Sequence, residues 1–99
     1  MEKIDKEKIL EMLCSEDIEL RRLGISILEQ NYIIPNWIYL RNSYKENSVF
    51  SFKPLHGGFA FNTNDILYGI IECSQFHRKS TIETLIETII EYNERIKKD

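Results

Sequence analysis

The first residues that could perform chemistry are His56, Gly57 and Gly58, within the stretch SFKPLHGGFAFN at residues 51–62. A glycine loop binds phosphate when its backbone amides lead into the N-terminus of a helix. Here the glycines lead into an alternating apolar stretch that is typical of a strand, so we interpret them as a turn. A His-Gly-Gly run also lines the oxyanion hole of some esterases, but the chain has no GxSxG motif and is too short for that fold.

Cys73 and His77 are a second possible catalytic pair, because residues four apart lie on one face of a helix. However, the apolar run IIECSQF accommodates a buried thiol, and His77 opens the polar run HRKS that we expect to end the helix. Together with Cys14 and His56 these residues offer zinc-ligand types, but without the local spacing of a zinc site. We therefore expect no catalytic residue, no metal and no cofactor.

The middle of the chain is unusually aromatic. Residues 32–62 hold eight of the eleven aromatic residues, with three basic residues against one acidic, whereas the whole chain carries a net charge of −3. Tyrosine, tryptophan and arginine dominate the energetics of protein interfaces, and aromatic side chains also stack on nucleic-acid bases. The alternative is that these aromatics only complete a small core. We predict the following partner-binding residues: Trp37, Tyr39, Arg41, Tyr44 and Lys45.

Apolar residues at helical spacing predict two helices on each side of this segment. We expect the first at about residues 5–13 and the second from Ser15 through the stripe that ends at Leu28. A third follows the cap candidates at 62–65, and a fourth begins at Ser80, whose spacing to Glu83 matches a capping box. On the fourth helix, the acidic ridge of Glu83, Glu87 and Glu91 either is solvated or faces a basic partner.

Within the aromatic middle, Pro35 favours an extended Ile34, and we expect one or two helical turns over 36–41. The stretches VFSF at 49–52 and GFAF at 58–61 each alternate with period two. Because a proline and two glycines lie between them or at their border, we predict that they form a short antiparallel hairpin. Phe50, Phe52, Phe59 and Phe61 would then share one face of it, leaving Trp37, Tyr39 and Tyr44 partly available.

The sequence thus predicts a single domain, residues 1–99, of the α+β class and mainly α. It has two N-terminal helices, an aromatic middle with a short antiparallel β-hairpin, and two C-terminal helices. No apolar run approaches the roughly 20 residues needed to cross a bilayer, no apolar leader opens the chain, and the two cysteines are typical of reduced core thiols. We expect a cytoplasmic protein.

The absence of a catalytic constellation favours a non-enzymatic module that binds another protein as a regulator, adaptor or inhibitor. The richness in isoleucine, lysine, glutamate and asparagine would suit an AT-rich genome, including that of a phage or mobile element. The alternative is a nucleic-acid-binding module that uses the aromatic and basic middle, although the chain as a whole is acidic. The identity of the partner and the oligomeric state stay open at this point.

Overall fold

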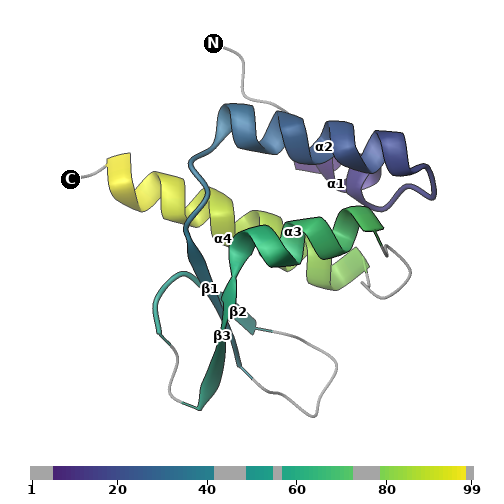
Figure 1. Cartoon of the computed structure of the whole chain (residues 1–99). Coiled ribbons are helices and arrows are strands. Elements are labelled where there is room, and N and C mark those ends of the chain that lie inside the picture. The colour runs from purple at the N-terminus through teal and green to yellow at the C-terminus, as the bar shows by residue number, and fades with distance from the viewer. Residues whose placement is uncertain (1–5, 42–48, 55–56, 73–78, 98–99) are drawn as a thin grey trace.

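The computed structural model describes residues 6–41, 49–54, 57–72 and 79–97, which form four helices and a three-stranded antiparallel sheet (Figure 1). The predicted α+β, mainly α class is confirmed, with two helices before the sheet and two after it. The elements are α1 (Lys6–Leu13), α2 (Ile18–Asn31), β1 (Trp37–Arg41), β2 (Val49–Ser51), β3 (Gly58–Asn62), α3 (Thr63–Glu72) and α4 (Lys79–Lys97).

The sheet has the strand order β2-β1-β3, which corrects two predictions about the aromatic middle. Residues 37–41, expected to form helical turns, are the central strand β1. The stretches at 49–51 and 58–62 are strands as predicted, but they do not pair with each other, because each pairs antiparallel with β1. The consecutive antiparallel pair is therefore β1 with β2, and β3 adds on the other side of β1.

Short polar side chains begin two of the helices. The Asp17 carboxylate accepts a hydrogen bond from the backbone N–H of Glu19 at 2.9 Å, so Asp17 rather than Ser15 is the N-cap of α2. Asn62 caps α3 in the same way, accepting from the N–H of Asn64 at 3.0 Å. The predicted N-cap at Ser80 is wrong, since α4 begins at Lys79 and already includes Ser80.

The core lies between the helices and one face of the sheet. Figure 1 shows the helices gathered above the sheet, whose strands run down and away from them. Ile38 of β1 is fully buried at this junction. Apolar side chains from all four helices complete the core: Ile9, Leu10, Leu13, Ile25, Leu28, Leu67, Ile70, Ile82, Leu85, Ile86 and Ile89. In the described part of the chain, no helix is long and apolar enough to cross a membrane.

Candidate protein-binding surface

Strand β1 presents different side chains to the two faces of the sheet. Ile38 is buried and Leu40 half-buried on the face toward the helices. Their cross-strand partners share that face: Phe61 lies opposite Ile38, while Phe59 and Phe50 lie opposite Leu40. The prediction that Phe50, Phe52, Phe59 and Phe61 share a face is therefore confirmed for the three that lie in strands, while Phe52 lies beyond the end of β2. The alternate residues of β1, Trp37 and Tyr39, lie on the other face.

We call this other face the open sheet face and define it by Trp37, Tyr39, Ser51, Ala60 and Asn62. Tyr39 lies opposite Ser51 and Ala60, and Trp37 lies opposite Asn62. Trp37 is 51% exposed, Ala60 is exposed, and the other three side chains are half-buried. None of the five carries a charge. The two rings therefore form an uncharged aromatic platform on the central strand of the sheet.

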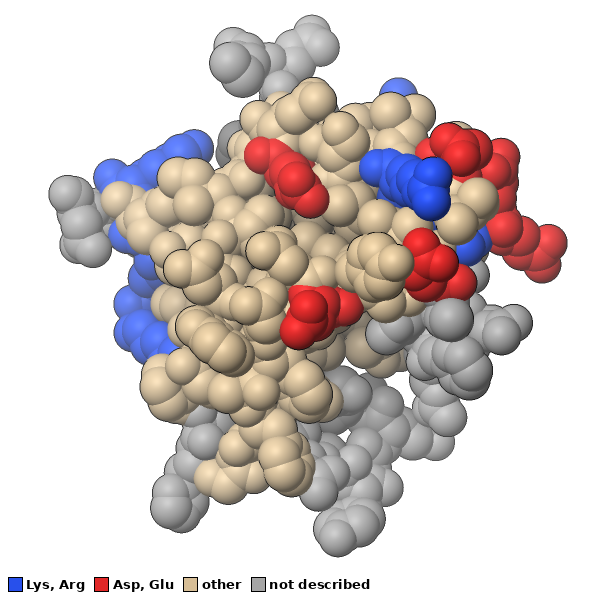
Figure 2. Space-filling model, viewed as in Figure 1, with Lys and Arg blue, Asp and Glu red and all other residues tan. Residues whose placement is uncertain are grey.

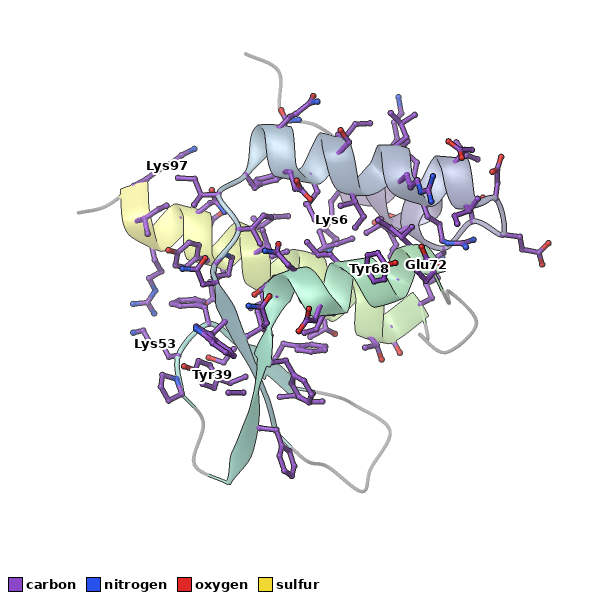
Figure 3. The ribbon with its side chains drawn as sticks, viewed as in Figure 1. Lys6, Tyr39, Lys53, Tyr68, Glu72 and Lys97 are labelled. Carbon is purple, nitrogen blue, oxygen red and sulfur yellow. The ribbon has the colours of Figure 1, made fainter. Side chains whose placement is uncertain are left out.

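A basic side chain lies beside the sheet. Lys53, just beyond β2, is exposed, and its Nζ lies 5.8 Å from the centre of the Phe52 ring. The Phe52 ring in turn packs edge-on against Tyr92 of α4, with ring centres 5.5 Å apart. Figure 3 shows Tyr39 and Lys53 on the same side of the sheet. In Figure 2, basic side chains lie along the left edge of the molecule, whereas the right side carries both acidic and basic side chains and the middle of the view carries isolated acidic ones.

Two of the five predicted binding residues are brought together here. Trp37 and Tyr39 are two positions apart on one strand and one face, and both are partly available as predicted. Arg41 ends the same strand, opposite Gly58 and Val49. The Arg41 side chain and the residues Tyr44 and Lys45 lie outside the part of the chain that the structure describes. Whether these five residues bind a partner stays a prediction.

A second apolar feature lies on the helix side of the sheet and was not predicted. It is an open groove with a volume of about 190 Å³ between the sheet, α3 and α4. Its lining residues are Leu40, Phe50, Phe61, Ile66, Ile70, Thr81, Ile82 and Leu85. The apolar stripes identify these residues as core candidates, but a periodic pattern carries no information on where packing leaves space between elements.

The other candidate chemical groups give no site in the described residues. Gly57 has a φ of +74° and leads into β3, which supports its interpretation as a turn residue rather than part of a phosphate loop. Gly58 is the first residue of β3 and does not have a positive φ, so only one of the two glycines needs this geometry. Three candidates, His56, Cys73 and His77, lie outside the described residues.

Cys14 is a half-buried thiol packed against the core. Burial raises its pKa above the ordinary value, and the nearby positive charge of Lys79 opposes that shift only partly. Such a thiol is a weak nucleophile at neutral pH. Among the residues that the structure describes, no three His, Cys, Asp or Glu side chains are grouped so that they could hold a metal ion.

The acidic ridge on α4 contacts the first helix. The Lys6 ammonium donates to the Glu87 carboxylate at 2.8 Å. This hydrogen bond is the main cause of a raised Lys6 pKa, to which the charges of Glu87, Glu83 and Glu7 add. Part of the ridge thus has a basic partner within the chain.

Comparison with known proteins gives no relative, since no family model, curated protein or solved structure matches this chain.

Proposed function

We propose that this chain is a small, non-enzymatic intracellular module that binds another protein through the open sheet face. The observation that carries the proposal is the exposure of Trp37 beside Tyr39 on the central strand. A large aromatic side chain that stays half in water forgoes burial that would stabilise the fold, and such side chains are the usual anchors of protein interfaces. A regulator, adaptor or inhibitor of another protein would act in this way.

The flatness of a sheet face and its lack of charge fit a protein partner better than a phosphate backbone. None of the five residues of the open sheet face can neutralise a phosphate, and the chain carries a net charge of −3. Nucleic-acid affinity depends on many Lys and Arg contacts to phosphates. The exposed Lys53, just beyond β2, fits the rim of a protein interface, where charge guides association.

The test compares Trp37→Ala with Tyr68→Ala, a matched control that removes another exposed aromatic ring. Tyr68 is 65% exposed on α3, away from the sheet (Figure 3). We expect the wild type and Tyr68→Ala to capture the same protein from the native cell. Trp37→Ala should bind that protein at least about thirtyfold more weakly. Both variants must keep the wild-type circular dichroism spectrum.

Full capture of every partner by a folded Trp37→Ala variant would disprove the role of the open sheet face. Co-purified nucleic acid would favour the alternative function if its affinity shows a steep log-log dependence on salt. That slope should then shrink by about 1 for each basic contact removed, beginning with Arg41 and Lys45.

A further inference from the structure

The hydrogen-bonding pattern of β3 shows which of its backbone groups are free. The N–H of Thr63 donates to the carbonyl of Asn36 at 3.0 Å, which extends the β1–β3 register by one pair. Hydrogen-bonded pairs alternate along an antiparallel ladder, so Phe61 and Phe59 point their backbone groups toward β1. The N–H and C=O groups of Gly58 and Ala60 and the N–H of Asn62 consequently point outward, from the edge of the sheet. The C=O of Asn62 begins the hydrogen bonding of α3, because Asn62 is the N-cap of that helix.

Among the described residues, this edge lacks the usual protection against pairing with another strand. Natural edge strands are commonly short or carry lysine, proline or a bulge. The β2 edge follows this rule, because it has three residues and is followed by Lys53 and Pro54. In contrast, β3 has the sequence GFAFN, with no charge and no proline. Figure 1 shows the lower part of β3 extending below α3, away from the helices.

Two exposed rings lie on one face of this edge. Phe59 is 53% exposed and Phe61 is 39% exposed, and both are on the face toward the helices. They are placed symmetrically about Ala60, one residue on each side. An antiparallel partner centred on Ala60 that repeats this order of residues would therefore put an aromatic ring opposite each of them.

We propose that β3 pairs antiparallel with β3 of a second copy of this chain, about a twofold axis at Ala60. Ala60 then lies opposite Ala60 of the second copy, and Gly58 opposite Asn62. Ala60 can then exchange both of its hydrogen bonds with Ala60 of the second copy, and the N–H of Asn62 can donate to the C=O of Gly58 of the second copy, so the outward groups fit this register. Phe59 meets Phe61 of the second copy in a pair without direct hydrogen bonds, where side chains approach most closely and aromatic pairs stabilise a sheet.

The dimer joins the two sheets into one in the order β2-β1-β3-β3-β1-β2. The open sheet faces of both copies then lie on the same side and present two pairs of Trp37 and Tyr39. This arrangement would strengthen binding to a partner with repeated sites. The pairing itself needs neither ring, because Trp37 and Tyr39 lie on the face opposite Phe59 and Phe61. It can therefore be tested without knowing any partner.

Sedimentation analysis of the purified full chain tests the dimer. We expect the average mass to rise from the monomer mass of 11.8 kDa toward twice that value as the protein concentration increases from about 10 µM to 1 mM. Weak association of this kind suits an interface of a few strand residues. Ala60→Pro removes an outward N–H but no bond to β1, and Ala60→Lys places two positive charges opposite each other at the axis. Each should weaken dimerisation at least about tenfold.

Ser26→Lys is the matched control for Ala60→Lys, since it adds the same charge at an exposed position on α2. It should dimerise like the wild type. A wild-type chain that keeps the monomer mass up to about 1 mM would overturn the proposal. So would folded Ala60 variants that dimerise with wild-type affinity.

Disulfide formation tests the register directly and does not depend on how well the proline variant folds. In a background with Cys14→Ala and Cys73→Ala, Ala60→Cys should cross-link to itself on oxidation, because facing residues of a hydrogen-bonded pair fall within disulfide reach. Gly58→Cys alone should not, but should cross-link when mixed with Asn62→Cys. Failure of Ala60→Cys to cross-link, or self-linking of Gly58→Cys to the same extent, would show that the register is wrong.

Discussion

Asn93 of α4 and Ile33, in the connection between α2 and β1, exchange two hydrogen bonds. The N–H of Ile33 donates to Asn93 Oδ1 at 2.8 Å, and Asn93 Nδ2 donates to the carbonyl of Ile33 at 2.9 Å. The same Nδ2 also donates to the carbonyl of Ile89, one turn earlier in α4, at 2.7 Å. The amide side chain thus bonds both backbone groups of Ile33, as a residue of a neighbouring strand would, and fixes the position of the chain just before β1.

Replacement of Asn93 should destabilise the fold. Asn93→Ala leaves the Ile33 N–H and C=O without these partners, so we expect the free energy of unfolding to fall by about 1 to 2 kcal/mol. Asn93→Asp should also destabilise, because a carboxylate accepts from the N–H but places its charge against two carbonyls. Urea unfolding measures both. Asn31→Ala is the control, since Asn31 makes a similar bond to the carbonyl of Ile27 on an exposed surface, and it should cost less than about 0.5 kcal/mol.

Arg21 joins α2 to the end of α3, and its replacement should also destabilise the fold. It is only 6% exposed; Nε and Nη2 donate to the Ile71 carbonyl at 2.9 and 2.7 Å, and Nη1 donates to the Ser15 carbonyl at 2.8 Å. Its positive charge also lies at the C-terminal end of α3, where the helix dipole favours it. Arg21→Met should lower the free energy of unfolding by about 3 kcal/mol.

The neighbouring arginine provides the control for this change. Arg22 is exposed and contacts Glu19 at 3.5 Å, so Arg22→Met should change the free energy of unfolding by less than about 0.5 kcal/mol. Arg21→Lys should recover part of the loss, because an ammonium cannot span both carbonyls with the geometry of a guanidinium. Equal losses for the Arg21 and Arg22 variants in thermal unfolding would contradict this assignment.

The sequence predicts the helices well and the sheet only in part, for a physical reason. Each helix has apolar residues at helical spacing, which predict the helix, although on α2 two of them, Leu20 and Leu23, are exposed. The central strand β1 has apolar residues on both faces, with Ile38 and Leu40 toward the helices and Trp37 and Tyr39 on the open face. A continuous apolar run of this kind cannot be distinguished from a buried helical turn by its period. Pro35 does not resolve this ambiguity, because a proline can precede either a helix or a strand.

The interactions of Arg21 and Asn93 could not be predicted for a different reason. Helical spacing places Arg21 on the face of Ile25 and Leu28, and Asn93 on the face of Ile86 and Ile89. It does not show which carbonyl or N–H each side chain bonds, because those partners include residues 50 and 60 positions away. The aromatic density of the middle did identify Trp37 and Tyr39 as candidates. The direction in which each ring points follows only from the register of β1 with its two neighbours.

The two adjacent glycines before β3 should respond differently to alanine. Gly57 has a φ of +74°, where a side chain strains the backbone, so Gly57→Ala should lower the free energy of unfolding by about 1 kcal/mol. Gly58 starts β3 without a positive φ, so Gly58→Ala should change the free energy of unfolding by less than about 0.5 kcal/mol. Denaturant unfolding of both variants measures the difference. A larger loss in the free energy of unfolding for Gly58→Ala than for Gly57→Ala would contradict this prediction and indicate that the turn geometry lies at Gly58.

Gly24 on α2 tests how closely α1 and α2 pack. A Cβ at this position would lie 3.0 Å from Met12 Cβ and 3.1 Å from Leu13 Cδ2, both on α1. Alanine favours a helix over glycine by about 1 kcal/mol, whereas overpacking a core costs about 1 to 3 kcal/mol. The Met12 Cβ is attached to the backbone and cannot rotate away, so we expect the overpacking cost to exceed the gain in helix propensity.

Gly24→Ala should therefore lower the free energy of unfolding by about 1 kcal/mol, and Gly24→Leu by more, since it adds further atoms in the same space. Ser26→Ala is the control on the exposed side of α2, where it removes only a long, exposed contact of 3.4 Å from Gln30 Nε2 to Ser26 Oγ and should stabilise by a few tenths of a kcal/mol. Thermal unfolding of the three variants distinguishes the two effects. If Gly24→Ala is as stabilising as Ser26→Ala, α1 moves away from α2 at little cost, and close packing at Gly24 does not hold the two helices together.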